Sequence, residues 1–368
     1  MVPFIDGSRC TDCGVCASRC PEQNEPNRTH HNYIRMFGVK NKNDTILCKS
    51  SSGGVFHGIA AHILKMPDSA VFGCAFNEHT VARHICAADI NGLAFMHGSK
   101  YVQSDVGDTY AQAKDLLDNG ATVFFSGAPC QIAGLYAYLD RDYDNLVTAD
   151  FVCHGVPSPL LFKRYIEWLG DKMGDTIIYY NFRDKTTYGW GNTANAKTKK
   201  NNKTIFSKTD PYYSTFINAS TLRECCYNCR YTNIRRVSDI TIGDFWGVEN
   251  VHPDFYDKNG VSIVIINTKK GELLFNQLNN NFYIIETTLE NVIPKNPNLL
   301  NPSPRPTQRD DIYNGINNTA QFFNKPVFKI KWTTHIKVYI KTHIKRILPP
   351  AWLTLYRTIK HKRRSGGQ

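Results

Sequence analysis

The order of apolar and polar positions predicts a body built from alternating strands and helices. From about residue 48 onward, short apolar runs alternate with stretches in which apolar positions recur every three or four residues. The first pattern is typical of strands and the second of amphipathic helices, so the chain is predicted to have an α/β (mixed α+β) fold. The predicted strands are residues 70–76, 122–126, 146–153, 175–182, 239–243 and 262–267. The predicted helices are residues 54–65, 109–118, 131–139, 159–169 and 270–279.

Shifts in composition divide the chain into predicted segments. A length of 368 residues is enough for two or three packed units. Residues 26–45 are polar and rich in Asn and Lys, so they are interpreted as a linker. The remaining segments are a cysteine-rich N-terminal segment at 1–30, an α/β domain at 45–153, a second cysteine-bearing domain at 154–310 and a basic tail at 325–368.

Composition indicates a cytoplasmic protein whose thiols are reduced. Hydrophobic residues make up 42% and charged residues 21% of the chain, which is typical of a globular protein. The chain has neither a basic start resembling a secretory signal nor an apolar window of about 18 residues that would span a membrane. Its 12 cysteines are therefore expected to serve metal or redox chemistry rather than disulfides.

The N-terminal segment carries a run of cysteines with the spacing of a 4Fe-4S ligand loop. Two residues separate each of the first three cysteines, and three residues separate the last two, which a proline follows. This is the bacterial ferredoxin run, and it is far more specific than a lone C-x-x-C. The cysteines are Cys10, Cys13, Cys16 and Cys20.

The source of the fourth ligand stays open at this point. In two-cluster ferredoxins the last cysteine of each run binds the other cluster, and no partner run is present here. Three hypotheses remain: Cys20 closes the same cluster, a distant cysteine such as Cys48 supplies the ligand, or the run is a shortened two-cluster module. A zinc site is a weaker alternative, because zinc favours separated C-x-x-C pairs.

A second set of cysteines is dispersed over three predicted loops. Cys130 lies between a predicted strand and helix, where the helix dipole is expected to favour the thiolate, and Cys153 ends another predicted strand. If those strands are parallel neighbours, both sulfurs emerge at one edge of the sheet. Cys226 and Cys229 add a two-thiol hook. The hypotheses are a second cluster, a zinc site on the hook, a Cys130 nucleophile beside His154, or no function.

Two glycine- and serine-containing loops resemble ligand-binding turns. Residues 50–55, Ser-Ser-Ser-Gly-Gly-Val, precede a predicted helix and offer hydroxyl and N–H groups to an anion, although a helix-capping turn has the same composition. Residues 98–104 place a lysine and a tyrosine in another loop, and residues 238–247 end a predicted strand in Asp244, Phe245 and Trp246. Each signal is weak by itself.

Taken together and in this order, the motifs resemble the coenzyme F420 hydrogenase/dehydrogenase beta-subunit family of flavin and iron-sulfur oxidoreductases. The resemblance covers about residues 5–300. It rests on the ferredoxin run at 10–21, Ser-Ser-Ser-Gly-Gly-Val-Phe at 50–56, Gly-Ser-Lys-Tyr-Val-Gln-Ser at 98–104, Ser-Gly-Ala-Pro-Cys-Gln at 126–131, Val-Cys-His-Gly-Val-Pro-Ser-Pro at 152–159, Cys-Tyr-Asn-Cys at 226–229 and Ser-Asp-Ile-Thr-Ile-Gly-Asp-Phe-Trp-Gly at 238–247.

The resemblance implies a set of cofactors and partners. It implies FAD in the α/β body and a second 4Fe-4S cluster, with electrons passing between a reduced carrier and an organic acceptor. The carrier would be a deazaflavin, a ferredoxin or an electron-donor protein, and the acceptor a small molecule or a sugar intermediate in surface polysaccharide biosynthesis. The implied flavin contacts are Ser52, Gly53, Gly54, Lys100, Gln103 and Asp244. The implied ligands of the second cluster are Cys130, Cys153, Cys226 and Cys229.

Relatives of this shape commonly carry two ferredoxin runs, whereas this chain shows one. An electron path that needs two N-terminal clusters is therefore in doubt. Two other hypotheses stay open: an electron-transfer subunit without a substrate of its own, and a thiol enzyme that uses Cys130.

The excess of positive charge lies in the C-terminal tail. The net charge is +12, and beyond Asp311 the chain has no acidic residue. Basic residues interleaved with Trp332 and Tyr339 suit an anionic membrane surface, whereas nothing in the sequence resembles a nucleic-acid-reading module. The predicted alternatives are peripheral membrane contact and a solvated basic helix, with no nucleic-acid partner. The basic residues of the tail are Lys325, Lys329, Lys331, Lys337, Lys341, Lys345, Arg346, Arg357, Lys360, Lys362, Arg363 and Arg364.

Overall fold

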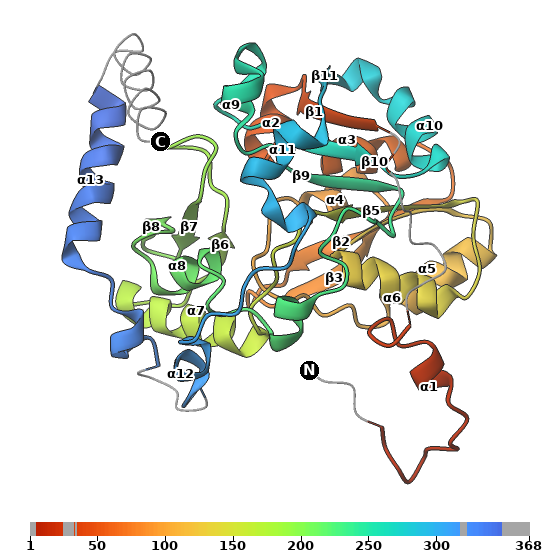
Figure 1. The fold of residues 1–368 in the computed structure, drawn as a ribbon, viewed down its shortest axis with the longest axis horizontal. Helices are drawn as coiled ribbons and strands as arrows, with labels where there is room; N and C mark the ends of the chain where they lie inside the picture. Colours follow the sequence, from red (N-terminus) through yellow and green to blue (C-terminus); the bar gives the residue numbers. More distant parts are fainter. Residues whose placement is uncertain (1–4, 25–32, 34, 317–321, 348–368) are drawn as a thin grey trace.

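A computed structural model describes residues 5–24, 33, 35–316 and 322–347 (Figure 1). The body is built around an eight-stranded sheet with the strand order β11-β1-β10-β9-β5-β4-β2-β3, and a separate sheet has the order β6-β7-β8. The predicted α/β class is therefore confirmed. The strands are β1 Arg35–Asn41, β2 Ser69–Phe76, β3 Ala82–Ala87, β4 Thr122–Ser126, β5 Leu146–Phe151, β6 Tyr179–Asn181, β7 Thr193–Lys197, β8 Asn202–Phe206, β9 Ile240–Asp244, β10 Ser262–Ile266 and β11 Phe282–Glu286.

The four strands at the centre of the large sheet run parallel. β2 pairs with β4, β4 with β5 and β5 with β9 in parallel register, whereas β3, β10, β1 and β11 are added in antiparallel register. The carboxyl ends of the four parallel strands therefore meet at one edge, where open α/β sheets place their ligands. The helices are α1 Val15–Ser18, α2 Asp44–Lys49, α3 Val55–Ile63, α4 Ile90–Ala94, α5 Thr109–Asp118, α6 Pro129–Leu139, α7 Pro159–Met173, α8 Pro211–Ile217, α9 Val248–Val251, α10 Lys269–Gln277, α11 Leu289–Val292, α12 Arg309–Tyr313 and α13 Trp332–Ile347.

Helices cover both faces of the sheet because its strands are apolar on both faces. Phe124 in β4 packs into a core with Ile59 of α3 and Phe275 of α10. Its neighbour Phe125 points the other way, into a core with Ile132 of α6. Successive side chains of a strand alternate between faces, so each face of β4 is buried under its own layer of helices.

A smaller, aromatic unit is inserted between β5 and β9. It contains α7, α8 and the three-stranded sheet, and its core is rich in Tyr and Phe, including Tyr165, Phe182 and Tyr213. α7 starts at Pro159, where the Ser158 side chain caps the helix, and it ends at Gly174, whose positive φ of 72° terminates the last turn. In Figure 1 this unit and α13 lie on the side of the molecule away from the eight-stranded sheet.

Several predicted elements agree with the structure, and others need correction. The predicted helix 109–118 and strand 122–126 are α5 and β4 with the same bounds. The linker predicted at 26–45 is wrong for residues 35–41, which form β1 inside the large sheet between β10 and β11. The strand predicted at 175–182 is confined to the three residues of β6. Strands β3, β7, β8 and β11 were not predicted.

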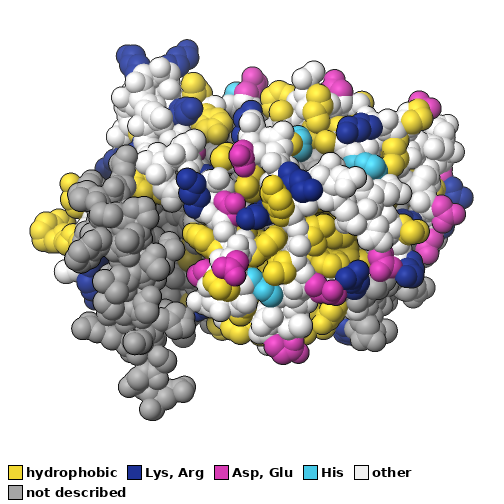
Figure 2. Space-filling view, turned by 90° about the horizontal axis from the view of Figure 1, so that it is seen from above, with side chains coloured by type: hydrophobic (Ala, Val, Ile, Leu, Met, Phe, Trp, Pro, Cys, Tyr) yellow, Lys and Arg dark blue, Asp and Glu magenta, His cyan; other side chains and the backbone are white. Residues whose placement is uncertain are grey.

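Strands from both sides of the boundary predicted at 153/154 share one sheet, since β5 pairs with β9. The basic and acidic side chains are mixed over the visible face of the body in Figure 2, in keeping with a tail that holds the charge excess. In the part of the chain that the structure describes, no helix is both long enough and apolar enough to cross a membrane.

Candidate functional site

A cavity of about 640 Å³ lies at the carboxyl edge of the parallel strands. Its volume is within the range of roughly 300–1,000 Å³ that is usual for small-molecule sites. The walls come from the segment after β4, the segment after β5, the end of β9, the loop 50–54 and the loop 98–104. The dispersed sequence motifs other than the ferredoxin run therefore contribute residues to one cavity.

Three cysteines of the second set converge on this cavity from three segments. Cys130 is the second residue of α6, directly after β4, and Cys153 follows the end of β5. Cys226 lies in the short 3-10 helix Glu224–Asn228, and Cys229 ends that turn. Cys130, Cys153 and Cys226 line the cavity, together with Cys225. Because β4 and β5 are parallel neighbours, the prediction that Cys130 and Cys153 emerge at one edge is confirmed.

Gly155 lets the loop after β5 pack tightly against the hook. Its φ of +110° lies in the left-handed region, and a Cβ atom built on it would come within 2.9 Å of the Cβ atom of Cys226. The N–H group of Gly155 donates a hydrogen bond to the Cys153 sulfur, with a distance of 3.4 Å. A glycine at this point therefore brings the Cys153 loop and Cys226 into direct contact.

Burial and neighbouring thiols raise the pKa values of Cys130 and Cys153 in the metal-free chain. Desolvation by the surrounding walls raises the pKa of the Cys130 thiol well above its ordinary value, and the nearby Cys153 and Cys229 act in the same direction. Burial also raises the pKa of Cys153 to about 11. The prediction that the helix dipole makes Cys130 a thiolate is therefore wrong for the metal-free chain, because desolvation and neighbouring thiols outweigh the dipole.

A buried ion pair stabilises the segments that carry the cysteines. Arg236 Nη2 lies 2.8 Å from Asp150 Oδ1, and both side chains are fully buried. Arg236 also donates hydrogen bonds to the carbonyl oxygens of Tyr231 and Phe151. It thus connects the end of β5, which leads to Cys153, with the loop that follows Cys229.

The donor set consists of thiols, and thiolate is the usual ligand of iron-sulfur clusters. Among the described residues, no three His, Cys, Asp or Glu side chains approach closely enough to hold one metal ion. A cubane distributes its four thiolates over four irons, so its ligands need not meet at one point, and thiolate is its usual ligand. The alternative of a Cys130 nucleophile activated by His154 has no supporting contact, because no hydrogen bond joins Cys130 to that ring within the described residues.

The ferredoxin run lies beside this second set of cysteines. Cys10, Cys13 and Cys16 are exposed, and Cys20 is half-buried. The Tyr231 hydroxyl donates a hydrogen bond to the Pro21 carbonyl, and Arg19 pairs with Asp140 at the end of α6. Glu22 is close enough to raise the pKa of Cys130. Figure 1 shows the same placement, with α1 below α6.

The Ser-Gly-Gly loop is held by the sheet rather than left open. The N–H group of Gly53 donates to Ser262 Oγ at 2.8 Å, and Ser52 Oγ donates to the Val261 carbonyl at 2.9 Å. A Cβ atom on Gly53 would lie 2.1 Å from the Val39 carbonyl oxygen, so a side chain cannot fit there. Gly53 therefore serves the close approach to β1 and β10, and it is Gly54, with a φ of +78°, that faces the cavity at the start of α3.

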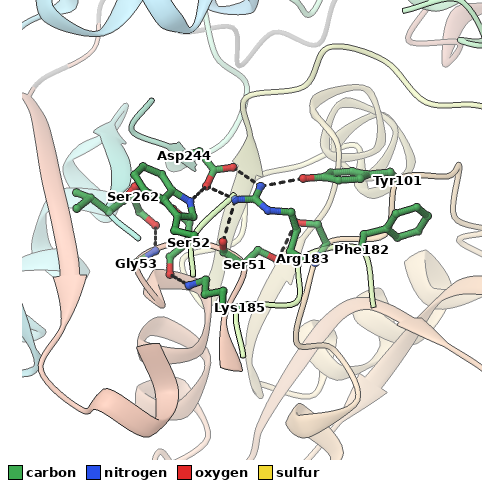
Figure 3. A network of polar contacts seen from close by, with 12 residues as sticks. Ser51, Ser52, Gly53, Tyr101, Phe182, Arg183, Lys185, Asp244 and Ser262 are labelled. Carbon is green, nitrogen blue, oxygen red and sulfur yellow. Dashed lines mark hydrogen bonds and ion pairs between the residues drawn. The ribbon is translucent and has the colours of Figure 1, made fainter. Parts of the chain in front are cut away.

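Arg183 is the centre of a polar network on the cavity wall (Figure 3). Its two terminal nitrogens contact Asp244, with Nη1–Oδ2 at 2.7 Å and Nη2–Oδ1 at 3.0 Å. Nη1 also donates to the Tyr101 hydroxyl, and Nη2 to the Ser51 carbonyl. The guanidinium lies over the ring of Trp246, whose indole stacks on Trp190 at 4.6 Å. Arg183 was not among the predicted site residues, although it stood next to a predicted strand.

One donor of this buried guanidinium has no partner within the described residues. The Nε–H group of Arg183 is buried and makes no hydrogen bond, while the residue as a whole is 3% exposed. An unsatisfied buried donor costs about 1–3 kcal/mol, so it marks a place where a ligand acceptor would be stabilising. The four donors that do have partners hold this fifth one in place.

The predicted contacts Lys100 and Gln103 line the cavity, but Lys100 Nζ and Gln103 Oε1 already have hydrogen-bond partners. Lys100 Nζ donates to the carbonyl oxygens of Met96 at 3.0 Å and His97 at 2.8 Å, and burial lowers its pKa to about 8. Gln103 Oε1 accepts a hydrogen bond from Arg223. Both side chains therefore order the loop 98–104, and Lys100 also adds positive charge to the cavity.

Residues 120–292 match the family model for the C terminus of the coenzyme F420 hydrogenase/dehydrogenase beta subunit. The match begins at the approach to β4, ends with α11, and includes the second set of cysteines and Asp244. This part of the chain is therefore similar to that family. The beta-subunit region covers just under half of the chain, and the ferredoxin run lies outside it. Hydrogenases and dehydrogenases are oxidoreductases, so the family is one of redox enzyme subunits.

A solved structure also resembles the chain. A chain of the xenon-derivatised F420-reducing [NiFe] hydrogenase complex from Methanosarcina barkeri is 17% identical, with a TM-score of 0.48, and the match covers 74% of this chain and 87% of that one. The assignment of the fold class rests on the strand order described above. The comparison with curated proteins gives no match.

Proposed function

We propose that the protein is a cytoplasmic iron-sulfur flavoprotein oxidoreductase. The observation that carries the proposal is the convergence of Cys130, Cys153 and Cys226, from three separate segments, on a cavity that the Ser-Gly-Gly loop and Arg183 also line, with Cys229 close to Cys130 and Cys153. Thiolates suit a 4Fe-4S cluster, and a cavity with buried cationic donors suits a phosphorylated cofactor. The N-terminal run, anchored beside the second set, would hold another cluster.

FAD fits the cavity in three respects. The volume of about 640 Å³ is ample for a large ligand. Arg183, Arg223 and Lys100 line it, whereas Asp244 is the acidic residue among the lining side chains within the described part of the chain. The free Nε–H group of Arg183 supplies a fixed donor, and Gly54 presents the N-terminus of α3, a nine-residue helix, to an anion.

The cofactors would supply the redox chemistry, with flavin joining one-electron and two-electron steps, while the protein positions and shields them. Electrons would enter through Cys10, Cys13, Cys16 and Cys20 from a reduced ferredoxin, a deazaflavin or a donor protein. The second set lies beside this run, and Cys130, Cys153 and Cys226 are themselves part of the cavity wall. The acceptor would be a small molecule or a sugar intermediate, with surface polysaccharide synthesis as the proposed setting.

A second candidate is a non-catalytic electron-transfer subunit. It is favoured by the family match, because the matched description is that of a beta subunit. Such a subunit would hold clusters but would turn over an acceptor only in the presence of its partner. Flavin in the isolated chain that can be reduced and then reoxidised by a small acceptor would favour the enzyme.

We also propose that α13 contacts an anionic membrane surface. Trp332 and Tyr339 are 76% and 63% exposed on this helix, and Lys337 is exposed beside them. Each basic residue near anionic lipid contributes about 1 kcal/mol to binding. The basic residues of the tail beyond residue 347 lie outside the described residues. Cosedimentation with vesicles of anionic lipid tests the proposal, and equal binding to neutral vesicles would contradict it.

Anaerobic reduction by ferredoxin tests the electron path. In the wild-type chain, reduced ferredoxin should bleach the flavin absorbance within seconds. The variant Cys13→Ser should retain its flavin but lose that reaction, since its entry cluster is missing. Equal rates in the two proteins would show that electrons do not enter through the N-terminal run.

A further inference from the structure

His57 and His97 form a direct imidazole pair on the cavity wall. His57 Nδ1 lies 2.8 Å from His97 Nε2, with the ring centres 4.9 Å apart. His57 is the third residue of α3, directly after the Ser-Gly-Gly loop, and His97 follows α4. Both rings line the cavity, and both are half-buried.

The surroundings keep both rings neutral. Burial lowers the pKa of His57, and burial together with His57, Lys100 and Lys49 lowers the pKa of His97 to about 4. The N-terminus of α3 disfavours a positive charge on His57 as well. At neutral pH each ring therefore carries one proton, and one ring must donate to the other across the 2.8 Å contact.

The outer nitrogens of the pair are available for proton transfer. His57 Nε2 and His97 Nδ1 make no hydrogen bond within the described residues, so the pair is a two-ring chain with a free nitrogen at each end. Other cavity histidines differ. His84 is bonded through both ring nitrogens, to the Ser126 carbonyl and Ser104 Oγ, and His154 adjoins Cys153. Lys100 fixes the backbone of His97 through its carbonyl oxygen at 2.8 Å.

We propose that His57 and His97 relay protons between solvent and the flavin in the cavity, an inference that rests on the proposed function. Clusters deliver electrons without protons, whereas two-electron reduction of a flavin takes up at least one proton. In the relay, His57 Nε2 releases its proton to the flavin while His57 Nδ1 takes the proton of His97 Nε2. His97 Nδ1 then takes a proton from water, and rotation of the rings restores the starting tautomers. The net change is the transfer of one proton from solvent to the flavin, while the external reductant supplies the electrons.

Replacing either ring tests the relay. With dithionite as reductant, His57→Asn and His97→Asn should bind flavin as the wild type does but reduce it about 100-fold more slowly, in line with the usual contribution of a positioned proton donor. The solvent deuterium isotope effect of the wild type should disappear from their slow residual rate. His62→Asn is the matched control, because His62 lies on the same helix and its ring contacts Gln277 instead.

A second measurement does not depend on flavin. Titration of histidine ring nitrogens by NMR in the flavin-free protein should show that His57→Asn raises the pKa of His97. An unchanged His97 titration, or unchanged reduction rates in flavin-loaded variants, would overturn the relay alone. Absence of flavin from the purified wild type would overturn the proposed function, and the relay with it.

Discussion

Arg183 and Asp244 join the two parts of the body at the cavity wall. Arg183 follows β6 of the small sheet, and Asp244 is the last residue of β9 in the large one. Two contacts, of 2.7 and 3.0 Å, hold the guanidinium against the carboxylate. The pair therefore fixes the small unit on the sheet and positions the Nε–H group that has no partner in the described chain.

Arg183→Lys should weaken flavin binding about 10- to 100-fold. Lysine keeps the charge but loses the two-point contact with Asp244 and the Nε donor, and hydrogen bonds to charged groups contribute about 1.5–3 kcal/mol. Fluorescence titration of the flavin-free protein measures the affinity. Arg35→Lys is the control, because Arg35 makes a similar two-point contact with Glu286 on the exposed surface. Equal affinities for wild type and Arg183→Lys would contradict the assignment.

Arg236→Met should lower the free energy of unfolding by about 3–5 kcal/mol. It would leave Asp150 as a buried charge without its partner, and breaking a buried ion pair from one side is that costly. The double variant Arg236→Met/Asp150→Leu should recover most of the loss, because it removes both charges. Chemical denaturation measures all three proteins. A loss below about 1 kcal/mol in the single variant would show that the pair does not hold the cysteine loops together.

The adjacent residues Cys225 and Cys226 should differ in their effect on iron content. Cys226 packs against Gly155 and hence against the Cys153 loop, whereas Cys225 is exposed. Cys226→Ser should lose the second cluster, and Cys225→Ser should keep it. Iron analysis after anaerobic purification distinguishes the two. Loss of iron in Cys225→Ser but not in Cys226→Ser would show that Cys225, and not Cys226, binds the cluster.

Asp210 should make the free energy of unfolding depend on pH. Burial raises the pKa of this carboxyl to about 6, while Tyr165 and the N–H group of Tyr213 bond its oxygens. The folded state then binds more protons than the unfolded state between pH 4 and 6, so this contribution to stability is present at acidic pH and is lost as the pH rises through 6. Relative to Asp210→Asn, the wild type should lose about 1–2 kcal/mol between pH 5 and 7. An equal difference in the free energy of unfolding between the wild type and Asp210→Asn at both pH values would contradict this.

Local patterns predicted the elements whose signals lie within their own residues. The strand Thr122–Ser126 has an uninterrupted apolar run, and the helix Thr109–Asp118 ends at Asn119-Gly120, so both agree with the structure. β1 was missed because Arg35–Asn41 mixes charged, glycine and apolar residues, and only its place between β10 and β11 makes it a strand. The short strands β7 and β8 depend in the same way on pairing with each other.

The site could be predicted only as far as residues with distinctive chemistry. Strand ends correctly placed Cys130 and Cys153 at one edge of the sheet. The clusters assigned to the run at residues 10–20 and to the second set of cysteines stay predictions. Arg183 and Arg236 carry no spacing signal, because their roles arise from contacts with Asp244 and Asp150, 61 and 86 residues away in sequence. The function of Gly53 as a packing residue likewise needed the position of the Val39 carbonyl oxygen.

Measurement of iron, acid-labile sulfide and flavin per chain after anaerobic purification tests the proposed clusters and the proposed flavin together. We expect about eight irons and one FAD in the wild type, and about four irons in Cys130→Ser. Four irons in both proteins would contradict the second cluster at Cys130, Cys153, Cys226 and Cys229, and a wild-type protein without flavin would contradict the assignment of the cavity.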